Sequence, residues 1–143
     1  MAKRKHIIPV RPGEKLELTI DNQGSSGDGI CKYEGYTLFV PGSLPGDQVF
    51  VEVIKITPRF GVTRIIEQRS ASPHRVDPPC PVFNQCGGCK LQDLKYQKQM
   101  EFKVNVVKDA LKHIAGIDPP SIQPIPAKKI YHYRNKGSFA VKK

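Results

Sequence analysis

Short hydrophobic runs separated by glycine and proline fill the first half of the chain. In Gln48–Ile56, valine occupies every second position at the start of the run, which is typical of a β-strand with one buried face. Glu34-Gly35 has the composition of a turn. Four further runs have strand character, namely Lys15–Ile20, Ile30–Tyr33, Thr37–Val40 and Gly61–Glu67. Five short strands with glycine-rich corners predict a mainly β fold, a small closed barrel of the oligonucleotide-binding (OB) type.

A helical period replaces this alternation further along the chain. Apolar side chains recur three or four positions apart, at Met100, Val104, Val107, Leu111 and Ile114. Lysines occupy the other faces. The sequence therefore predicts one helix over Leu91–Ala115, which Gly116 would end. The lysines are either solvated on a purely structural helix or face an anionic partner, and the pattern favours neither.

The end of the sequence differs in composition from the rest. Residues 117–127 carry four prolines, which indicates an extended linker. Beyond the linker the sequence is basic and has strand character around Ser138–Val141. A lone edge strand is not stable by itself, so we expect the chain to enter an incomplete α+β domain. The predicted organisation is a barrel at 1–70, a cysteine-rich loop with its helix at 71–116, and a linker with the first strand of the incomplete domain at 117–143.

A strong positive charge narrows the expected partners. Lys and Arg number 23 against 13 Asp and Glu, a formal charge of +10. Such a surplus favours polyanions, nucleic acid above all, although a soluble basic protein without a specific target has the same composition. No apolar run is long enough to span a membrane, no basic helix has an aromatic apolar face, and Ile7–Val10 is too short for a secretion signal. We therefore expect a cytoplasmic protein that binds no membrane.

Three of the four cysteines form a compact motif. Cys80, Cys86 and Cys89 have the spacing C-x5-C-x2-C, and two glycines separate the last pair. Glycines lack the Cβ atoms that would obstruct a tight wrap around a metal, and their amides can point toward sulfur. A disulfide is disfavoured in the cytosol and would leave one cysteine unpaired, and a redox-active C-x-x-C pair does not explain the third. The motif therefore predicts a metal site.

The identity of the metal depends on the fourth ligand. Zinc would be satisfied by the three thiolates and His74. An iron–sulfur cluster usually takes four cysteines. The remaining cysteine, Cys31, lies on a predicted strand, where we expect it to be a small buried hydrophobe. The fourth ligand of a cluster would then lie outside this chain.

Aromatic and basic residues around the last predicted hairpin offer a contact surface for RNA. Specific RNA recognition uses unstacked bases, which stack on aromatic rings. Phe60 lies between Arg59 and Arg64, with Lys55 close by in sequence. Lys32-Tyr33, before the Glu-Gly turn, would extend the same face. A core or turn role for Phe60 is the competing interpretation.

Two glycine-rich motifs of the first region have a recognisable pattern. Gly27–Ile30 reads G-D-G-I, aromatic residues surround Gly35, and Val40–Asp47 reads V-P-G-S-L-P-G-D. These residues resemble the TRAM domain, an RNA-binding barrel carried by RNA-modifying enzymes. The resemblance implies an OB-like barrel that binds RNA.

The cysteine motif continues as C-G-G-C-x2-Q to Gln92. It is similar to the iron–sulfur motif of the bacterial RNA uracil-5 (m5U) methyltransferases, in particular those that act on 23S ribosomal RNA. The order of barrel, motif and helix is also that of the family. The resemblance implies a 4Fe–4S cluster on Cys80, Cys86 and Cys89, with the fourth cysteine in a later central domain.

The end of the chain also resembles this family. Tyr133–Lys136 is similar to the first strand of its central domain, which implies that Arg134 and Lys136 contact RNA phosphates. In the family, S-adenosylmethionine binds a later Rossmann-like domain, where a catalytic cysteine attacks C6 of uracil and an acidic residue removes the C5 proton. A glycine-rich loop after a strand, of the kind that would hold this cofactor, does not occur in the sequence.

We therefore expect the RNA-binding N-terminal part of an S-adenosylmethionine-dependent RNA methyltransferase, without its cofactor site or catalytic residues. The expected partner is ribosomal RNA, with transfer RNA as the alternative, and the expected state is a monomer. Two other functions stay open. One is a stand-alone RNA-binding protein of the TRAM type, and the other is an interaction module stabilised by zinc.

Overall fold

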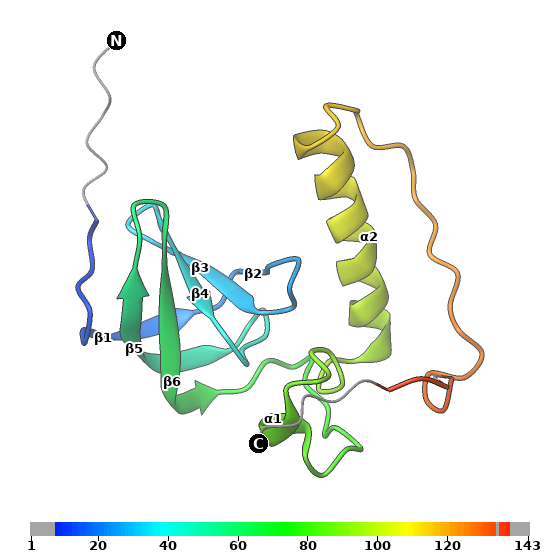
Figure 1. The fold of residues 1–143 in the computed structure, drawn as a ribbon, viewed down its shortest axis with the longest axis horizontal. Helices are drawn as coiled ribbons and strands as arrows, with labels where there is room; N and C mark the ends of the chain where they lie inside the picture. The colour runs from blue at the N-terminus through cyan, green and yellow to red at the C-terminus, as the bar shows by residue number, and fades with distance from the viewer. Residues whose placement is uncertain (1–7, 134, 138–143) are drawn as a thin grey trace. The chain divides into compact units, whose positions relative to one another are not determined.

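The computed structural model describes residues 8–133 and 135–137. The chain divides into two compact units, one ending at Lys95 and the other beginning at Tyr96. The first unit contains a single six-stranded sheet and the second contains the long helix (Figure 1). No helix within the described ranges is long and apolar enough to cross a lipid bilayer.

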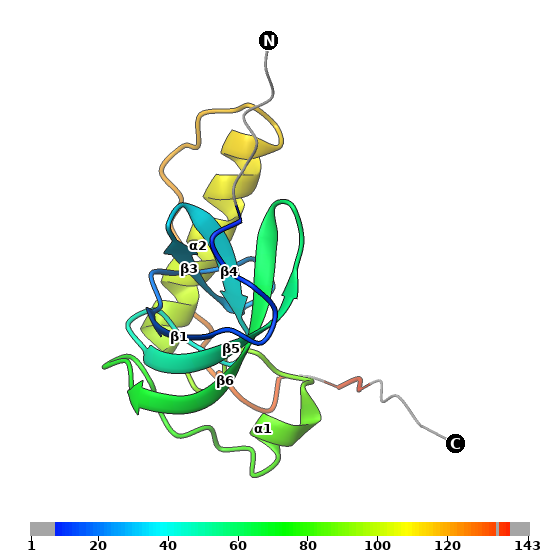
Figure 2. The same cartoon turned by 90° about the vertical axis from the view of Figure 1, so that its left-hand side faces the viewer.

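The strands of the first unit follow the order β1-β5-β6-β4-β3-β2 across the sheet. Their bounds are β1 (Lys15–Thr19), β2 (Asn22–Gln23), β3 (Gly29–Tyr33), β4 (Tyr36–Val40), β5 (Gln48–Ile56) and β6 (Phe60–Ser70). Neighbouring strands are antiparallel except β4 and β6, which pair in parallel. Strands β5 and β6 are irregular in register at three places, and both views show them bending as the sheet curls (Figures 1 and 2). This is the small barrel-like fold expected from the sequence, with β2 added and β6 four residues longer than predicted.

Inward-facing side chains of the curled sheet form the core. Val49, Val51 and Val53 of β5 are each at most 1% exposed, which explains why the alternating run is a strand. Cys31 of β3 is 3% exposed. Burial, together with the charge of Asp21, raises the pKa of its thiol to about 11. Cys31 is therefore the small core residue that the sequence indicated, since a neutral thiol packs as a hydrophobe.

The turn predicted at Glu34-Gly35 joins β3 to β4. Both residues adopt left-handed backbone angles, with φ of 47° and 81°. A two-residue hairpin turn needs positive φ at both positions because its twist then matches that of the strands. Glycine supplies this conformation without steric cost at the second position.

The second unit begins with a shorter helix than the sequence predicts. Helix α2 covers Tyr96–His113 and not Leu91–Ala115. Leu94 is buried and forms an antiparallel bridge with Arg75, so tertiary pairing competes with helix formation before Tyr96. Gly116, at φ 67°, ends the helix as expected. The predicted apolar stripe is present, but no residue of α2 is buried.

Two other segments differ from the predictions. A one-turn helix, α1 (Phe83–Cys86), lies inside the cysteine motif, where the sequence indicated only a loop. Residues 114–133 and 135–137 form no helix or strand, although Ala127 N–H donates to the Tyr96 hydroxyl at 2.7 Å. The predicted strand at Ser138–Val141 lies outside the described residues, as does Arg134.

Candidate nucleic-acid interface

The outward side chains of three neighbouring strands form one continuous surface, which we call the aromatic face. Alternation along each strand and the register between strands define it, since Phe39 pairs with both Ile30 and Val62, and Thr37 pairs with Phe60. Its members are Ile30 and Lys32 on β3, Thr37 and Phe39 on β4, and Phe60, Val62 and Arg64 on β6. The side chains between them point inward and are buried.

Two phenylalanines dominate this surface. The rings of Phe39 and Phe60 pack edge to face, with centroids 5.4 Å apart. Phe60 is nevertheless 37% exposed, so part of its ring is open to solvent. The sequence singled out Phe60 but not Phe39. Phe39 lies between two buried residues of β4 and therefore faces outward. The sequence alone could not place it near Phe60, because that proximity depends on the parallel β4–β6 register.

The turn between β5 and β6 holds Phe60 in place. The Thr57 hydroxyl donates to the Phe60 carbonyl at 2.7 Å and accepts from the Phe60 N–H at 3.1 Å. The Tyr36 hydroxyl in turn donates to the Thr57 carbonyl at 2.6 Å. Arg59 lies in this turn and is exposed. These hydrogen bonds hold the backbone of Phe60, which directly follows the exposed Arg59.

Cations surround the aromatic pair. Lys32, Lys55 and Arg59 are exposed, and Lys55 lies opposite Val62 in the register. Arg64 forms an ion pair of 2.7 Å with Glu52 but keeps 69% of its side chain exposed. The fold thus brings together Lys55, Arg59, Phe60 and Arg64, the four barrel residues that the sequence proposed for RNA contact.

Other expected contact residues lie elsewhere. Lys32 belongs to the aromatic face, as expected. Tyr33, expected beside it, is partly buried against the core and belongs to the inner side. Lys136 is exposed in the second unit. The role of all these residues in RNA contact stays a prediction.

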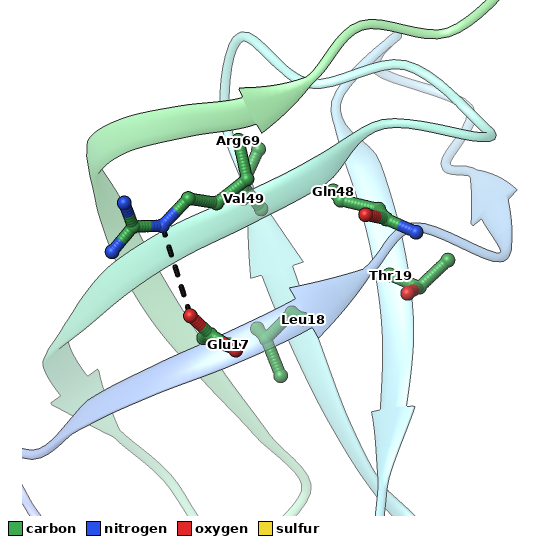
Figure 3. Close-up of a pocket in the computed structure, with 6 residues that line it drawn as sticks. All are labelled: Glu17, Leu18, Thr19, Gln48, Val49 and Arg69. Carbon is green, nitrogen blue, oxygen red and sulfur yellow. Dashed lines mark ion pairs between the residues drawn. The ribbon is translucent and has the colours of Figure 1, made fainter.

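A hollow on another part of the sheet, about 400 Å³ in volume, differs from the aromatic face in its charges (Figure 3). Its lining consists of Glu17, Leu18, Thr19, Gln48, Val49 and Arg69. Arg69 lies over the ring of Phe50, 5.4 Å from its centroid. Two carboxylates pair with it, Glu67 at 2.7 Å and Glu17 at 3.7 Å. These two carboxylates compensate the charge of Arg69.

The predicted metal ligands lie in the irregular segment before α2. Cys86 and Cys89 are exposed, Cys80 is half-buried, and all three thiols are free. The Gln92 amide donates to the Cys89 sulfur at 3.2 Å. Across the described ranges, no three or more His, Cys, Asp or Glu side chains are arranged to hold a metal ion. The donor set is that of a soft metal, but the described conformation does not gather it into a site.

The chain matches one known domain family and is similar to several known proteins. The family described as TRAM domain matches residues 9–66, which cover the barrel. A protein named as an uncharacterized RNA methyltransferase of Halalkalibacterium halodurans is 39% identical over 138 residues, 96% of this chain and 30% of that protein. A protein of the same description from Clostridium tetani is 37% identical over 97% of this chain and 30% of its own length. The chain therefore spans about 30% of the length of the curated relatives it matches.

A solved structure is also similar. The Pyrococcus abyssi tRNA (uracil-54, C5)-methyltransferase, in complex with S-adenosyl-L-homocysteine, has a TM-score of 0.52 and 31% sequence identity. The match covers 80% of this chain and 24% of that chain. Residues 9–66 are thus a TRAM domain. Over nearly its whole length the chain is similar to part of proteins named RNA methyltransferases, and over 80% of its length to part of a tRNA (uracil-54, C5)-methyltransferase.

Proposed function

We propose that the aromatic face binds single-stranded or looped RNA, and that the chain is the RNA-binding part of an S-adenosylmethionine-dependent RNA uracil-5 methyltransferase. One observation carries the proposal, the partly exposed Phe39–Phe60 pair between exposed cations. Aromatic rings stack with any base, and cations beside them contact the phosphates. Small OB barrels bind oligonucleotides on this part of their surface, the central strands and adjoining loops.

In this proposal the chain contributes binding and leaves the chemistry to other parts of the enzyme. S-adenosylmethionine and the catalytic residues would belong to sequence that the relatives have and this chain does not cover. The face offers stacking and charge, which hold exposed bases without choosing one sequence. We propose 23S ribosomal RNA as the target because of the cysteine motif. The structural neighbour is named for tRNA, which makes a tRNA loop the direct competitor in a test.

We keep the metal as part of the proposal, with three thiolates from Cys80, Cys86 and Cys89 as ligands of a 4Fe–4S cluster and zinc as the alternative. Three thiols within ten residues support it. Cys31, buried in the barrel core, does not belong to the set. The described conformation does not gather the thiols, and the proposed RNA binding uses the aromatic face and not the metal. Metal analysis of protein purified without oxygen decides, since iron and zinc at substoichiometric levels would remove this part of the proposal.

Fluorescence anisotropy with short labelled RNAs tests the RNA-binding proposal. We expect a single-stranded oligonucleotide to bind more tightly than the same sequence in a duplex, because paired bases cannot reach the rings. Phe39→Ala combined with Phe60→Ala should reduce the affinity at least tenfold, since stacking contributes roughly 1–3 kcal/mol per base. Arg69→Ala is the matched control on the charge-compensated hollow. Equal affinity of the double variant and the parent protein would refute the role of the aromatic face.

A further inference from the structure

Another hollow lies inside the first unit, where the barrel loops meet residues 71–95, which we call the cysteine segment. It has a volume of about 280 Å³. The barrel contributes Gly27, Asp28, Pro41, Gly42, Ser43 and Leu44, and the cysteine segment contributes Phe83, Asn84, Gly87, Cys89 and Lys90. We call it the junction hollow. It shares Cys89 with the proposed metal ligands, but the other lining residues named here are not metal ligands in the proposal.

Buried ion pairs fasten the two walls of the junction hollow to each other. Arg75, at the start of the cysteine segment, donates to the carbonyl of Gly42 at 2.9 Å. Its guanidinium also pairs with Asp47 at 2.6 Å and with Asp93. Asp47 is fully buried and accepts in addition from the Ser72 N–H at 2.8 Å. These contacts join the start of the cysteine segment to the Val40–Asp47 loop, which supplies part of the lining.

Close backbone packing brings the walls together at a second place. Gly27 adopts a φ of 91°, and a Cβ at this position would lie 3.0 Å from Cβ of Lys90. Next to it, the Lys90 ammonium lies 3.4 Å from the Asp28 carboxylate. Only glycine combines this backbone conformation with so close an approach. The position of Lys90 relative to the barrel is thus set by backbone contact and by charge.

The lining matches the chemistry of a nucleobase. Phe83 supplies an aromatic surface, and the Asn84 amide supplies both a donor and an acceptor. The Lys90–Asp28 pair adds one more donor and one more acceptor without net charge. A base is flat, neutral and polar along its edges, so it can stack on the ring and exchange hydrogen bonds with these groups. An isolated phosphate would find its attraction to Lys90 offset by Asp28.

One short loop connects the junction hollow to the aromatic face. Gly24 borders the face, since a Cβ there would lie 3.0 Å from Ile30 and 3.5 Å from Phe39. Three residues on, Gly27 and Asp28 line the hollow. Two backbone hydrogen bonds of 2.8 Å, Gly24 N–H to Asp28 and Gly27 N–H to Gly24, keep the loop compact. An RNA strand that stacks on Phe39 can therefore continue across this loop into the hollow.

We propose that the junction hollow receives one unstacked nucleotide of the RNA strand that the aromatic face binds. The inference rests on the proposed function and adds a second contact point to it. It assigns RNA binding to Phe83 and Asn84 of the cysteine segment. The barrel and the cysteine segment then read one continuous stretch of single-stranded RNA.

The test is a double-mutant cycle between protein and RNA in reducing buffer. Phe83→Ala and, separately, Asn84→Ala are titrated with an intact single-stranded oligonucleotide and with a series in which each nucleotide in turn is abasic. For the intact RNA we expect Phe83→Ala to reduce affinity roughly tenfold. At one position of the series the abasic RNA should bind the variant and the parent protein equally, because the lost base was the partner of Phe83. Val82→Ala, an exposed neighbour outside the hollow, is the control.

The outcomes separate this inference from the proposed function. If Phe83→Ala binds intact RNA as tightly as the parent protein, or if its loss is the same at every abasic position, the junction hollow takes no base. The Phe39→Ala and Phe60→Ala double variant still reports on the aromatic face in either case. If neither set of variants changes RNA affinity, both proposals fail. The Asn84→Ala variant keeps the test valid if Phe83→Ala does not fold.

Discussion

The carboxylate of Asp47, at the end of the Val40–Asp47 loop, is paired at 2.6 Å with the guanidinium of Arg75, 28 positions further along the chain. Asp47 is fully buried, and Arg75 keeps 21% of its side chain exposed. The pair joins the barrel to the segment that carries the cysteines. The loop thus does more than reverse the chain direction, because its last residue anchors another part of the protein.

Removing Arg75 should therefore destabilise the first unit strongly. Arg75→Ala leaves Asp47 buried without its counter-charge, and breaking such a pair costs about 3 kcal/mol or more. Urea unfolding followed by circular dichroism measures the loss. Arg64→Ala breaks an exposed pair with Glu52 and should cost about 1 kcal/mol or less. Equal effects of the two substitutions would mean that the buried pair does not stabilise the fold.

The same pair predicts a loss of stability in acid. Burial by itself would raise the pKa of Asp47, but the hydrogen bonds and charge of Arg75 and the N–H groups of Leu44 and Ser72 hold this pKa below its ordinary value. The stabilisation is fully present above the pKa of an unfolded aspartate, about 3.9, and is lost as the pH falls through the lower folded pKa. Burial raises the pKa of Asp93, so its contribution has the opposite sign and partly offsets that of Asp47.

Asp47→Asn isolates this effect. The variant should be less stable than the parent protein at neutral pH, and its free energy of unfolding should fall less steeply below about pH 5. Urea unfolding at a series of pH values provides the comparison. Parallel curves for variant and parent would assign the acid sensitivity to other carboxylates.

The salt dependence of RNA binding should report the cations of the aromatic face. Each phosphate contact of a single strand contributes roughly 0.7 to the slope of log affinity against log salt. Lys55→Ala combined with Arg59→Ala should lower that slope by roughly 1 to 1.5. Anisotropy titrations between low and moderate salt give the slope. Arg69→Ala, outside the aromatic face, is the control. If the double variant has the same slope as the parent protein, the RNA phosphates do not contact Lys55 and Arg59.

Cysteine reactivity should separate the buried thiol of Cys31 from the exposed thiols of Cys86 and Cys89. Because the pKa of Cys31 is raised to about 11 and its side chain is buried, it should resist alkylation at pH 8 until the protein unfolds. In metal-free protein, Cys86 and Cys89 should react at once because they are exposed. Mass spectrometry after a short pulse of iodoacetamide identifies the labelled residues. Rapid labelling of Cys31 in folded protein would contradict its place in the core.

Metal removal should leave the attachment of the cysteine segment intact. Val76 N–H donates to the Asp93 carbonyl at 2.9 Å, and the Arg75–Leu94 bridge lies beside it. These contacts need no metal. Chelation should therefore increase hydrogen exchange within residues 80–90 and leave Val76 and Leu94 protected. Loss of protection at Leu94 on chelation would show that the metal holds the segment.

The sequence predicted the barrel strands well because alternation follows directly from burial of one face. The valines of β5 are the clearest case, and the turn at Glu34-Gly35 followed from its composition. β2 was missed since Asn22-Gln23 has no apolar side chain to mark it. The start of α2 was placed too early because pairing of Leu94 with Arg75 depends on residues far apart in sequence.

The site was partly predictable for the same reason. Phe60 and its neighbouring cations are close in sequence, so composition alone indicated them. Phe39 joins them through the parallel β4–β6 register, which no local pattern shows. The buried pair of Asp47 and Arg75 was not predicted, since charged residues are usually exposed and their burial depends on the fold of the loop between them.

The parallel contact of β4 with β6 also constrains how the protein is made. β4 ends at Val40, but its partner begins only at Phe60 and continues to Ser70. Until β6 has left the ribosome, the edge of β4 that it pairs with is unpaired, and the inner valines of β5 are exposed to water. The nascent chain therefore exposes an unpaired strand edge, which favours self-association, until β6 pairs with both β4 and β5.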